Sequence, residues 1–176
     1  MRLWSVFLPH DPLIILGIDP GLQKTGWGVI EQNGSSLRHV AHGLIKPNTS
    51  LSMPERLAVL ASELEHIIKL YTPYSCAIEN TFVNRNPETS LKLGMARGAL
   101  MSVMALKKLE VAEYSPNQIK KSVVGKGHAA KEQIGMMIGI LLPGCGSLGA
   151  DEADALAIAI THAHYGRIDA YTRTRA

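Results

Sequence analysis

Four acidic residues have the types and positions that suit metal-dependent chemistry: Asp19, Glu79, Asp151 and Asp154. Asp19 and Glu79 each end a run of apolar residues, where a charge is costly unless something neutralises it. Asp151 and Asp154 are three positions apart, so they share one face of a helix. Clustered carboxylates repel one another, and Mg²⁺ or Mn²⁺ relieves that repulsion better than zinc, which prefers Cys and His. Two such ions can activate water and stabilise the leaving oxygen in phosphodiester cleavage.

Each acid also has an ordinary explanation. Asp19 precedes Pro20-Gly21 and could be a turn residue. Glu79 could pair with a lysine, and Asp151 could be the N-cap of a helix. The residues alone therefore leave open whether the four acids form one metal site.

Two apolar stretches predict the strands that carry the first two acids, Leu13–Asp19 and Tyr74–Glu79. Asn33-Gly34 is a strong signal for a hairpin turn. Further strands are expected at Thr25–Glu31, Leu37–Ile45 and Val111–Tyr114. We expect the first three strands to form an antiparallel meander. The two acid-bearing strands should lie side by side and parallel, because open α/β sheets place their sites at that edge.

Capping signals and apolar spacing predict helices that begin near Ser52, Asn86, Ser115, Ala129 and Asp151. Their expected ends lie near Tyr71, Lys108, Val124, Leu142 and Tyr165. This order of elements predicts a mixed sheet with helices on its faces. The expected domain covers residues 13–165, between a flexible lead-in at 1–12 and a flexible tail at 166–176.

The composition is that of a folded globular chain. It has 176 residues, of which 46% are hydrophobic and 19% charged, which suggests one domain. The net charge of +3 permits a polyanionic partner without demanding one. Cys76 and Cys145 form no zinc spacing or disulfide framework, which favours a reducing, cytoplasmic compartment. No apolar run approaches the ~18 residues of a membrane span, so we expect no membrane partner.

Five groups of motifs follow one another along the chain. They are Ile15-Leu16-Gly17-Ile18-Asp19-Pro20-Gly21 with Thr25-Gly26-Trp27-Gly28, Ala77-Ile78-Glu79 with Phe82, Ser90-Leu91-Lys92-Leu93-Gly94 with Ala96-Arg97-Gly98, Val123-Val124-Gly125 with Gly127 and Lys131, and Ala150-Asp151-Glu152-Ala153-Asp154. In this order, from about Ile14 to His164, they resemble the RuvC family of crossover (Holliday) junction endodeoxyribonucleases. One such motif would be weak, but five in order are specific.

The resemblance implies a ribonuclease H-like fold with a mixed five-stranded sheet, and a homodimer with two active sites. It implies symmetric cutting of two opposed strands of four-way junction DNA in recombination and repair, leaving ligatable 5′-phosphate and 3′-hydroxyl ends. By position, Asp19, Glu79, Asp151 and Asp154 match the family's catalytic, metal-binding acids. They would hold two Mg²⁺ ions per site, with Mn²⁺ as a substitute. Coupling to the RuvA/RuvB branch-migration complex is implied by the resemblance alone.

The resemblance also implies DNA contacts. Phe82 matches an aromatic residue that stacks on a base near the junction centre, and Lys120 and Lys131 match lysines that contact the scissile region. Lys126 and His128 make the same basic segment more cationic, which suits phosphate binding. Two ordinary readings stay open, in which Phe82 packs into the core and the basic residues form a solvated face.

Other residues have alternative readings as well. Gly94 and Gly98 are four positions apart on the expected long helix. They allow either tight packing on the sheet or a close contact across a dimer twofold axis. For His162, His164 and Cys76 we expect structural roles.

Three other functions are alternatives to a junction endonuclease. A non-catalytic DNA-binding module on the same fold would lack one of the acids, and a nicking assay separates it from a nuclease. An ATP-using actin-like or sugar-kinase-like protein needs more than 176 residues, and failure to bind ATP would exclude it. A relative that acts on ribosomal RNA precursors would be separated by comparing four-way DNA with linear duplex and structured RNA.

Overall fold

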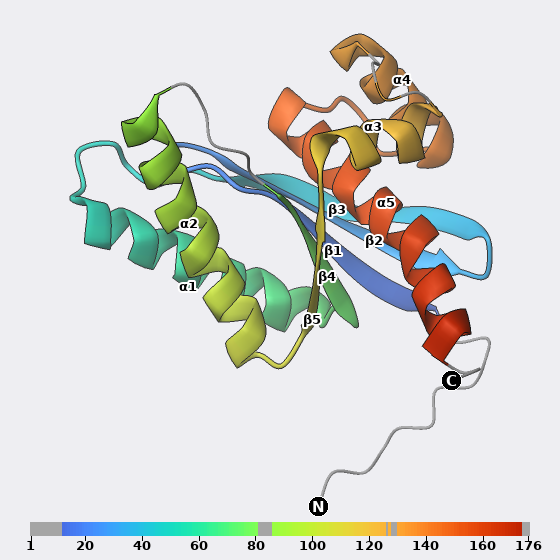
Figure 1. Cartoon of the computed structure of the whole chain (residues 1–176), viewed down its shortest axis with the longest axis horizontal. Helices are drawn as coiled ribbons and strands as arrows, with labels where there is room; N and C mark the ends of the chain where they lie inside the picture. The colour runs from blue at the N-terminus through green and yellow to red at the C-terminus, as the bar shows by residue number, and fades with distance from the viewer. Residues whose placement is uncertain (1–11, 81–85, 126, 128–129, 174–176) are drawn as a thin grey trace, which may run out of the picture.

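The computed structural model describes residues 12–80, 86–125, 127 and 130–173. Five strands form one mixed sheet in the order β3-β2-β1-β4-β5. The strands are β1 Leu13–Asp19, β2 Thr25–Asn33, β3 Ser36–Ile45, β4 Ser75–Glu79 and β5 Glu110–Tyr114. The helices are α1 Met53–Tyr71, α2 Pro87–Leu106, α3 Pro116–Val124, α4 Lys131–Leu141 and α5 Ala150–Arg173. The predicted sheet with flanking helices is confirmed (Figure 1).

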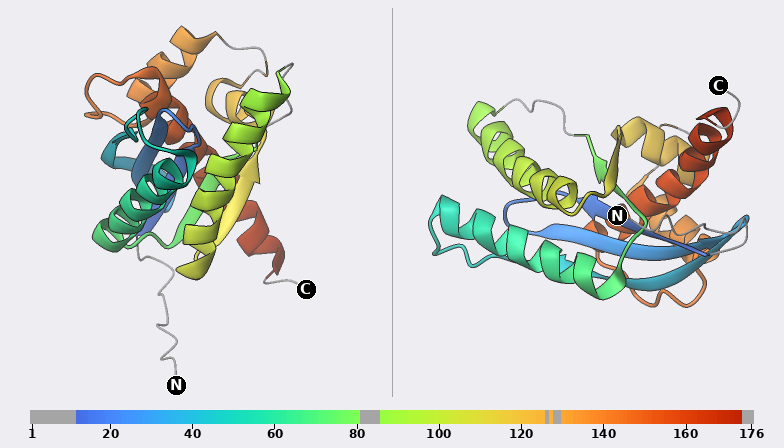
Figure 2. Two further views of the ribbon diagram at one scale, coloured as in Figure 1. Left: turned by 90° about the vertical axis from the view of Figure 1, so that its left-hand side faces the viewer. Right: turned by 90° about the horizontal axis from the view of Figure 1, so that it is seen from below.

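Two apolar clusters hold helices against opposite faces of the sheet. Leu16 and Ile18 of β1 pack with residues of α1 and α2, including Leu60 and Leu100. Ile15 of β1 packs with residues of α3, α4 and α5 on the other face. This alternation follows from the strand geometry, in which successive side chains point to opposite faces. The views in Figure 2 show α1 and α2 side by side, apart from α5.

The strand pairing agrees with the sequence prediction. β1 pairs antiparallel with β2, and β2 pairs antiparallel with β3, which forms the expected meander. Gly34 in the hairpin turn has a φ of 57°, a left-handed conformation that glycine adopts without strain. β1 and β4 are parallel neighbours, as are β4 and β5. The two acid-bearing strands therefore lie next to each other in the same direction.

Local signals explain where two of the helices begin and where α2 ends. At α1, the backbone N–H and the hydroxyl of Ser52 donate to the Glu55 carboxylate at 2.8 and 2.6 Å. At α2, the side chain of Asn86 accepts the Glu88 N–H at 3.0 Å. The helix α2 ends slightly before the predicted Lys108, because Lys108 has a φ of 60° and leaves the helical conformation.

The predicted end of the last helix at Tyr165 is wrong, because α5 continues to Arg173. Residues 166–173 of the segment expected to be a flexible tail, 166–176, are therefore helical. No proline interrupts this segment, and each residue added to the helix forms one more backbone hydrogen bond. Gly166 lowers the helix propensity by about 1 kcal/mol relative to alanine, which does not end the helix. The lead-in predicted at 1–12 lies outside the described residues, apart from Pro12. Among the helices of the described ranges, none has both the length and the apolarity to cross a membrane.

Candidate active site

Asp19 and Glu79 are neighbours at the C-terminal ends of two adjacent inner strands, β1 and β4. β1 and β4 run parallel with Ile18 opposite Ile78, and each acid is the next residue along its strand. Neighbouring strands lie roughly 4.8 Å apart. The two carboxylates therefore leave the sheet side by side, from the last residues of the two strands.

Both acids face the side of the sheet that α5 covers. Ile18 and Ile78 belong to the cluster under α1 and α2. Because side chains alternate along a strand, the next residues, Asp19 and Glu79, point to the opposite face. Both are half-buried, so water and ions reach them.

The first turn of α5 lies directly against the strand pair that ends at Asp19. Gly26 of β2 is the partner of Asp19, and a Cβ at Gly26 would lie 2.0 Å from the backbone oxygen of Asp151. A Cβ at Gly17 would lie 2.2 Å from the backbone oxygen of Ala155. Such an approach is possible only where the strand carries glycine. These glycines allow α5 to bring its first turn to the end of β1.

The first turn of α5 is capped without the Asp151 side chain. The carbonyl of Gly149 accepts the Ala153 N–H at 2.9 Å, and the Gly149 N–H donates to the Glu152 carboxylate at 2.8 Å. The N-cap explanation for Asp151 is therefore wrong. Its half-buried side chain lines a cleft of about 570 Å³, whereas Asp154 lines a separate cavity of about 270 Å³ on the side of α4.

The four acids fit Mg²⁺ in chemistry, although their side chains are not gathered around one point. Among the described residues, no group of three or more His, Cys, Asp or Glu side chains is arranged to hold a metal ion. The backbone brings Asp19, Glu79 and the first turn of α5 to one corner, and an all-carboxylate set suits a hard cation. Binding would require these carboxylates to turn towards a common ion, and their metal role stays a prediction.

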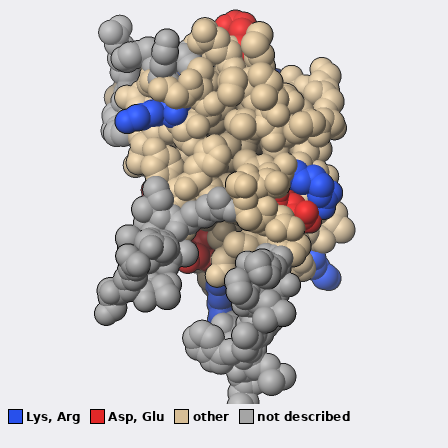
Figure 3. Space-filling model, turned by 90° about the vertical axis from the view of Figure 1, so that its right-hand side faces the viewer, with Lys and Arg blue, Asp and Glu red and all other residues tan. Residues whose placement is uncertain are grey.

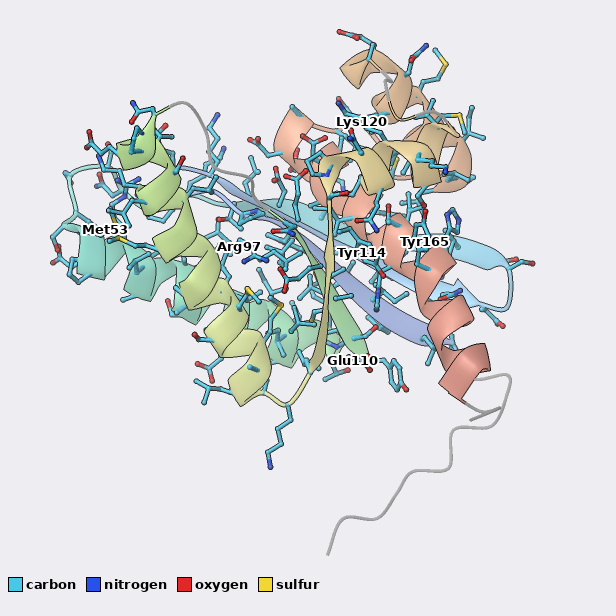
Figure 4. The ribbon with its side chains drawn as sticks, viewed as in Figure 1. Met53, Arg97, Glu110, Tyr114, Lys120 and Tyr165 are labelled. Carbon is cyan, nitrogen blue, oxygen red and sulfur yellow. The ribbon has the colours of Figure 1, made fainter. Side chains whose placement is uncertain are left out.

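Arg97 supports the site in a way that the sequence did not reveal. Its Nε donates to the backbone carbonyl of Glu79 at 3.1 Å, and its guanidinium also pairs with the Glu113 carboxylate of β5. Figure 4 shows Arg97 on α2, on the side that faces β5. Arg97 therefore fixes the end of β4 from which Glu79 projects. Arg97 belongs to one of the motifs that resemble the family, but no local sequence pattern indicates its contacts with Glu79 and Glu113.

A buried chain of hydrogen bonds fastens α5 to the sheet. The Tyr114 hydroxyl bonds to Nδ1 of His162 at 2.9 Å, and Nε2 of His162 bonds to the Ser75 hydroxyl at 2.9 Å. The rings of Tyr114 and Tyr165 also stack, with centroids 5.8 Å apart (Figure 4). His162 thus links the last helix to β4 and β5, in line with the structural role expected of it.

Other expectations have clear outcomes. His164 bonds to the Ser122 hydroxyl at 3.0 Å and ties α5 to α3. Cys76 is fully buried in the core, and burial raises the pKa of its thiol to about 12, so it stays protonated. Gly94 and Gly98 are exposed, and a Cβ at either would meet nothing within 4 Å. Packing of these glycines on the sheet is therefore excluded.

The predicted DNA-contacting residues are only partly described. Lys120 is half-buried on α3, a helix that contacts both α4 and α5 (Figure 4). Lys131 is the first residue of α4, and only its backbone is described. Phe82, Lys126 and His128 lie outside the described residues.

Comparisons with known proteins agree with this fold and arrangement. The family model for crossover junction endodeoxyribonuclease RuvC matches residues 15–162. The chain is 56% identical to the RuvC of Rhodospirillum rubrum over 151 residues, which cover 86% of this chain and 89% of the relative. It is 51% identical to that of Hyphomonas neptunium over 154 residues, which cover 88% and 92%.

Solved structures agree as well. The Thermus thermophilus RuvC in complex with a Holliday junction substrate superposes with a TM-score of 0.81 at 32% identity, covering 89% of this chain and 96% of that one. The yeast mitochondrial resolvase Ydc2 shares the fold, with a TM-score of 0.67 at 14% identity, over 91% and 83% of the two chains. The ordered motifs, the acids at one sheet edge and these matches together show that the chain belongs to the RuvC family of crossover junction endodeoxyribonucleases.

Proposed function

We propose that this chain resolves four-way Holliday junctions in DNA recombination and repair by paired symmetric nicks that leave 5′-phosphate and 3′-hydroxyl ends. As a member of its family it is a nuclease that acts on DNA. One observation carries the proposal furthest. The parallel register of β1 and β4 sets Asp19 beside Glu79 near the beginning of α5, the helix that carries Asp151 and Asp154.

The same four acids are proposed as the catalytic, metal-binding residues. Asp19, Glu79, Asp151 and Asp154 would hold Mg²⁺, two ions per site, with Mn²⁺ as a substitute. When bound, these ions lower the pKa of an attacking water and stabilise the departing 3′-oxygen. The protein's own part is to orient the acids, and the bond from Arg97 to the Glu79 carbonyl does this for β4.

We further propose that basic residues beyond β5 neutralise the phosphates near the scissile bond. Tyr114, the last residue of β5, pairs with Glu79, and α3 with Lys120 follows immediately. Lys120, Lys126, His128 and Lys131 would supply positive charge, the main source of affinity for DNA. Phe82 would stack on a base near the junction centre.

A homodimer is proposed through the outer face of α2. The exposed fractions of Leu91, Met95 and Leu106 are 61%, 40% and 80%. Gly94 and Gly98 leave open space on this helix, which supports a close helix contact across a twofold axis. Two copies would then present two active sites to a junction of matching symmetry.

Two wider parts of the proposal rest on the family. The RuvA/RuvB branch-migration complex is the partner that the family implies. The cytoplasm is the proposed compartment, and the two free, buried cysteines support a reducing environment.

The decisive test replaces Asp19 by Asn. The variant should bind four-way junction DNA with near-parental affinity but lose Mg²⁺-dependent cutting, because the amide keeps the shape and removes the charge. Glu63→Gln, an exposed acid on α1, is the matched control and should cut normally. Near-parental cutting by Asp19→Asn would exclude the assignment. Running the parent on four-way DNA, linear duplex and structured RNA in parallel would show whether the substrate class is right.

A further inference from the structure

A second group of basic residues lies on the opposite side of the sheet from α3. The cleft of about 570 Å³ beside Asp151 is formed by the turn between β1 and β2 and by the beginnings of α1 and α2. Its lining includes Lys24 from the turn, Arg56 from α1 and Lys92 from α2. Three cations from three separate elements thus meet one acid, Asp151, in the same hollow.

Arg56 is held in place by a hydrogen bond to the β1–β2 turn. Its Nη2 donates to the Leu22 carbonyl at 2.9 Å, which ties α1 to the β1–β2 turn. Its Nε is buried and has no hydrogen-bond partner within the part of the chain that the structure describes. A guanidinium carries five N–H donors in a rigid fork that matches phosphate geometry. Arg56 is therefore oriented before any ligand arrives.

The two lysines are accessible. Lys24 is exposed and takes part in none of the ion pairs of the described residues. Lys92 pairs with Glu88 one turn earlier on the same helix, and both side chains are exposed. Exposed pairs of this kind are weak. A phosphate can therefore take the place of Glu88 on the Lys92 ammonium.

The distribution of charge favours a strand of phosphates over a single anion. The cations come from the β1–β2 turn and from two helices, so three separate elements contribute positive charge to the cleft. By contrast, Figure 3 views the right-hand side of Figure 1, where α5 and the β2–β3 turn lie. Among the described atoms visible there, Lys and Arg form only separate spots.

We propose that the cleft lined by Lys24, Arg56 and Lys92 binds the phosphodiester backbone of DNA next to the active site. This inference rests on the proposed function and extends it. Asp151, one of the proposed catalytic acids, lines this cleft, so a strand bound there would pass beside the proposed active site.

The test measures binding of four-way junction DNA over a series of salt concentrations, with Ca²⁺ in place of Mg²⁺ to prevent cutting. Lys24→Gln and Lys92→Gln should each lower the slope of log affinity against log salt by about one unit, and the double variant by about two. Lys69→Gln is the matched control, because Lys69 is an exposed lysine in the last turn of α1, far from Arg56. It should keep the parental slope, affinity and cutting rate.

The outcomes separate this inference from the proposed function. Cutting of four-way DNA by the parent with Mg²⁺ is measured first. If the parent neither binds nor cuts that DNA, the proposed function fails, and this inference fails with it. If the parent cuts and the double variant keeps the parental salt slope, only the cleft assignment is overturned. An equal loss of slope in Lys69→Gln would overturn it as well. The salt slope would then depend on the net charge of the protein and not on the position of the lysine.

Discussion

Glycines occur in two regions of this molecule that differ in the space around them, one tightly packed and one open. Beneath α5, Gly17, Gly26 and Gly28 lie so close to the helix that a Cβ would come within 2.2, 2.0 and 2.7 Å of its atoms. On α2, Gly94 and Gly98 have nothing within 4 Å. The first set closes a contact within the chain and so positions the acids. The second set leaves a surface that a second copy can approach.

The largest effect is expected from Gly26→Ala. The new methyl group would collide with the backbone oxygen of Asp151, and neither backbone can yield without moving α5. We expect a loss of about 3 kcal/mol or more in the free energy of unfolding, since overpacking against backbone exceeds the usual range. Cutting should be lost as well. Urea unfolding measures the first and a junction assay the second. A parental urea midpoint would show that the contact beneath α5 is not tight.

The next effect concerns the buried bonds that fasten α5. His162→Phe removes two buried hydrogen bonds, one to Tyr114 and one to Ser75, and their loss should cost roughly 3 kcal/mol of unfolding free energy. His162→Gln should recover part of this loss. His164→Phe is the matched control, because His164 is exposed, and a small change is expected. Equal losses in the two phenylalanine variants would contradict the assigned role of the buried chain.

On α2 the same kind of substitution should have the opposite sign. In a single chain, Gly94→Ala and Gly98→Ala should each stabilise the helix by roughly 0.5–1 kcal/mol, because exposed space surrounds both positions. The double change to Leu should instead weaken the proposed dimer, raising its Kd at least about tenfold. Sedimentation over a range of concentrations measures this. An unchanged dimer Kd would move the twofold contact away from these glycines.

The smallest effect is a pH dependence on β3, away from α2. Nε2 of His39 lies 2.8 Å from Nδ1 of His42, and burial, followed by the charge of His42, lowers the pKa of His39 below 6.5. The folded state thus resists protonation that the unfolded chain accepts. This contribution to stability is present above about pH 6.5 and decreases as the pH falls below it. Unfolding at several pH values should show a slope that His39→Phe reduces, while the dimer Kd of the two proteins stays equal.

The parts of the site that follow from local pattern could be predicted from the sequence. The acids at the ends of two apolar runs correctly predict that Asp19 and Glu79 end neighbouring strands. Asn33-Gly34 correctly predicts the hairpin between β2 and β3. Contacts between distant segments could not be predicted in this way. The bond from Arg97 to the Glu79 carbonyl depends on how α2 crosses β4, which no spacing encodes. The capping of α5 could not be predicted from a single residue either, because the backbone of Gly149 and the side chain of Glu152 supply it together.

The place of α5 in the chain has a consequence for synthesis. Asp19 lies in the first strand, whereas Asp151 and Asp154 lie in the last helix, which packs on β1 and β2. A protein leaves the ribosome from its N-terminus, so β1 is made before α5 exists. A chain interrupted before α5 lacks two of the four proposed catalytic acids. If the four acids form the active site as proposed, nascent or prematurely terminated copies would be unable to cut DNA until the last helix has been made.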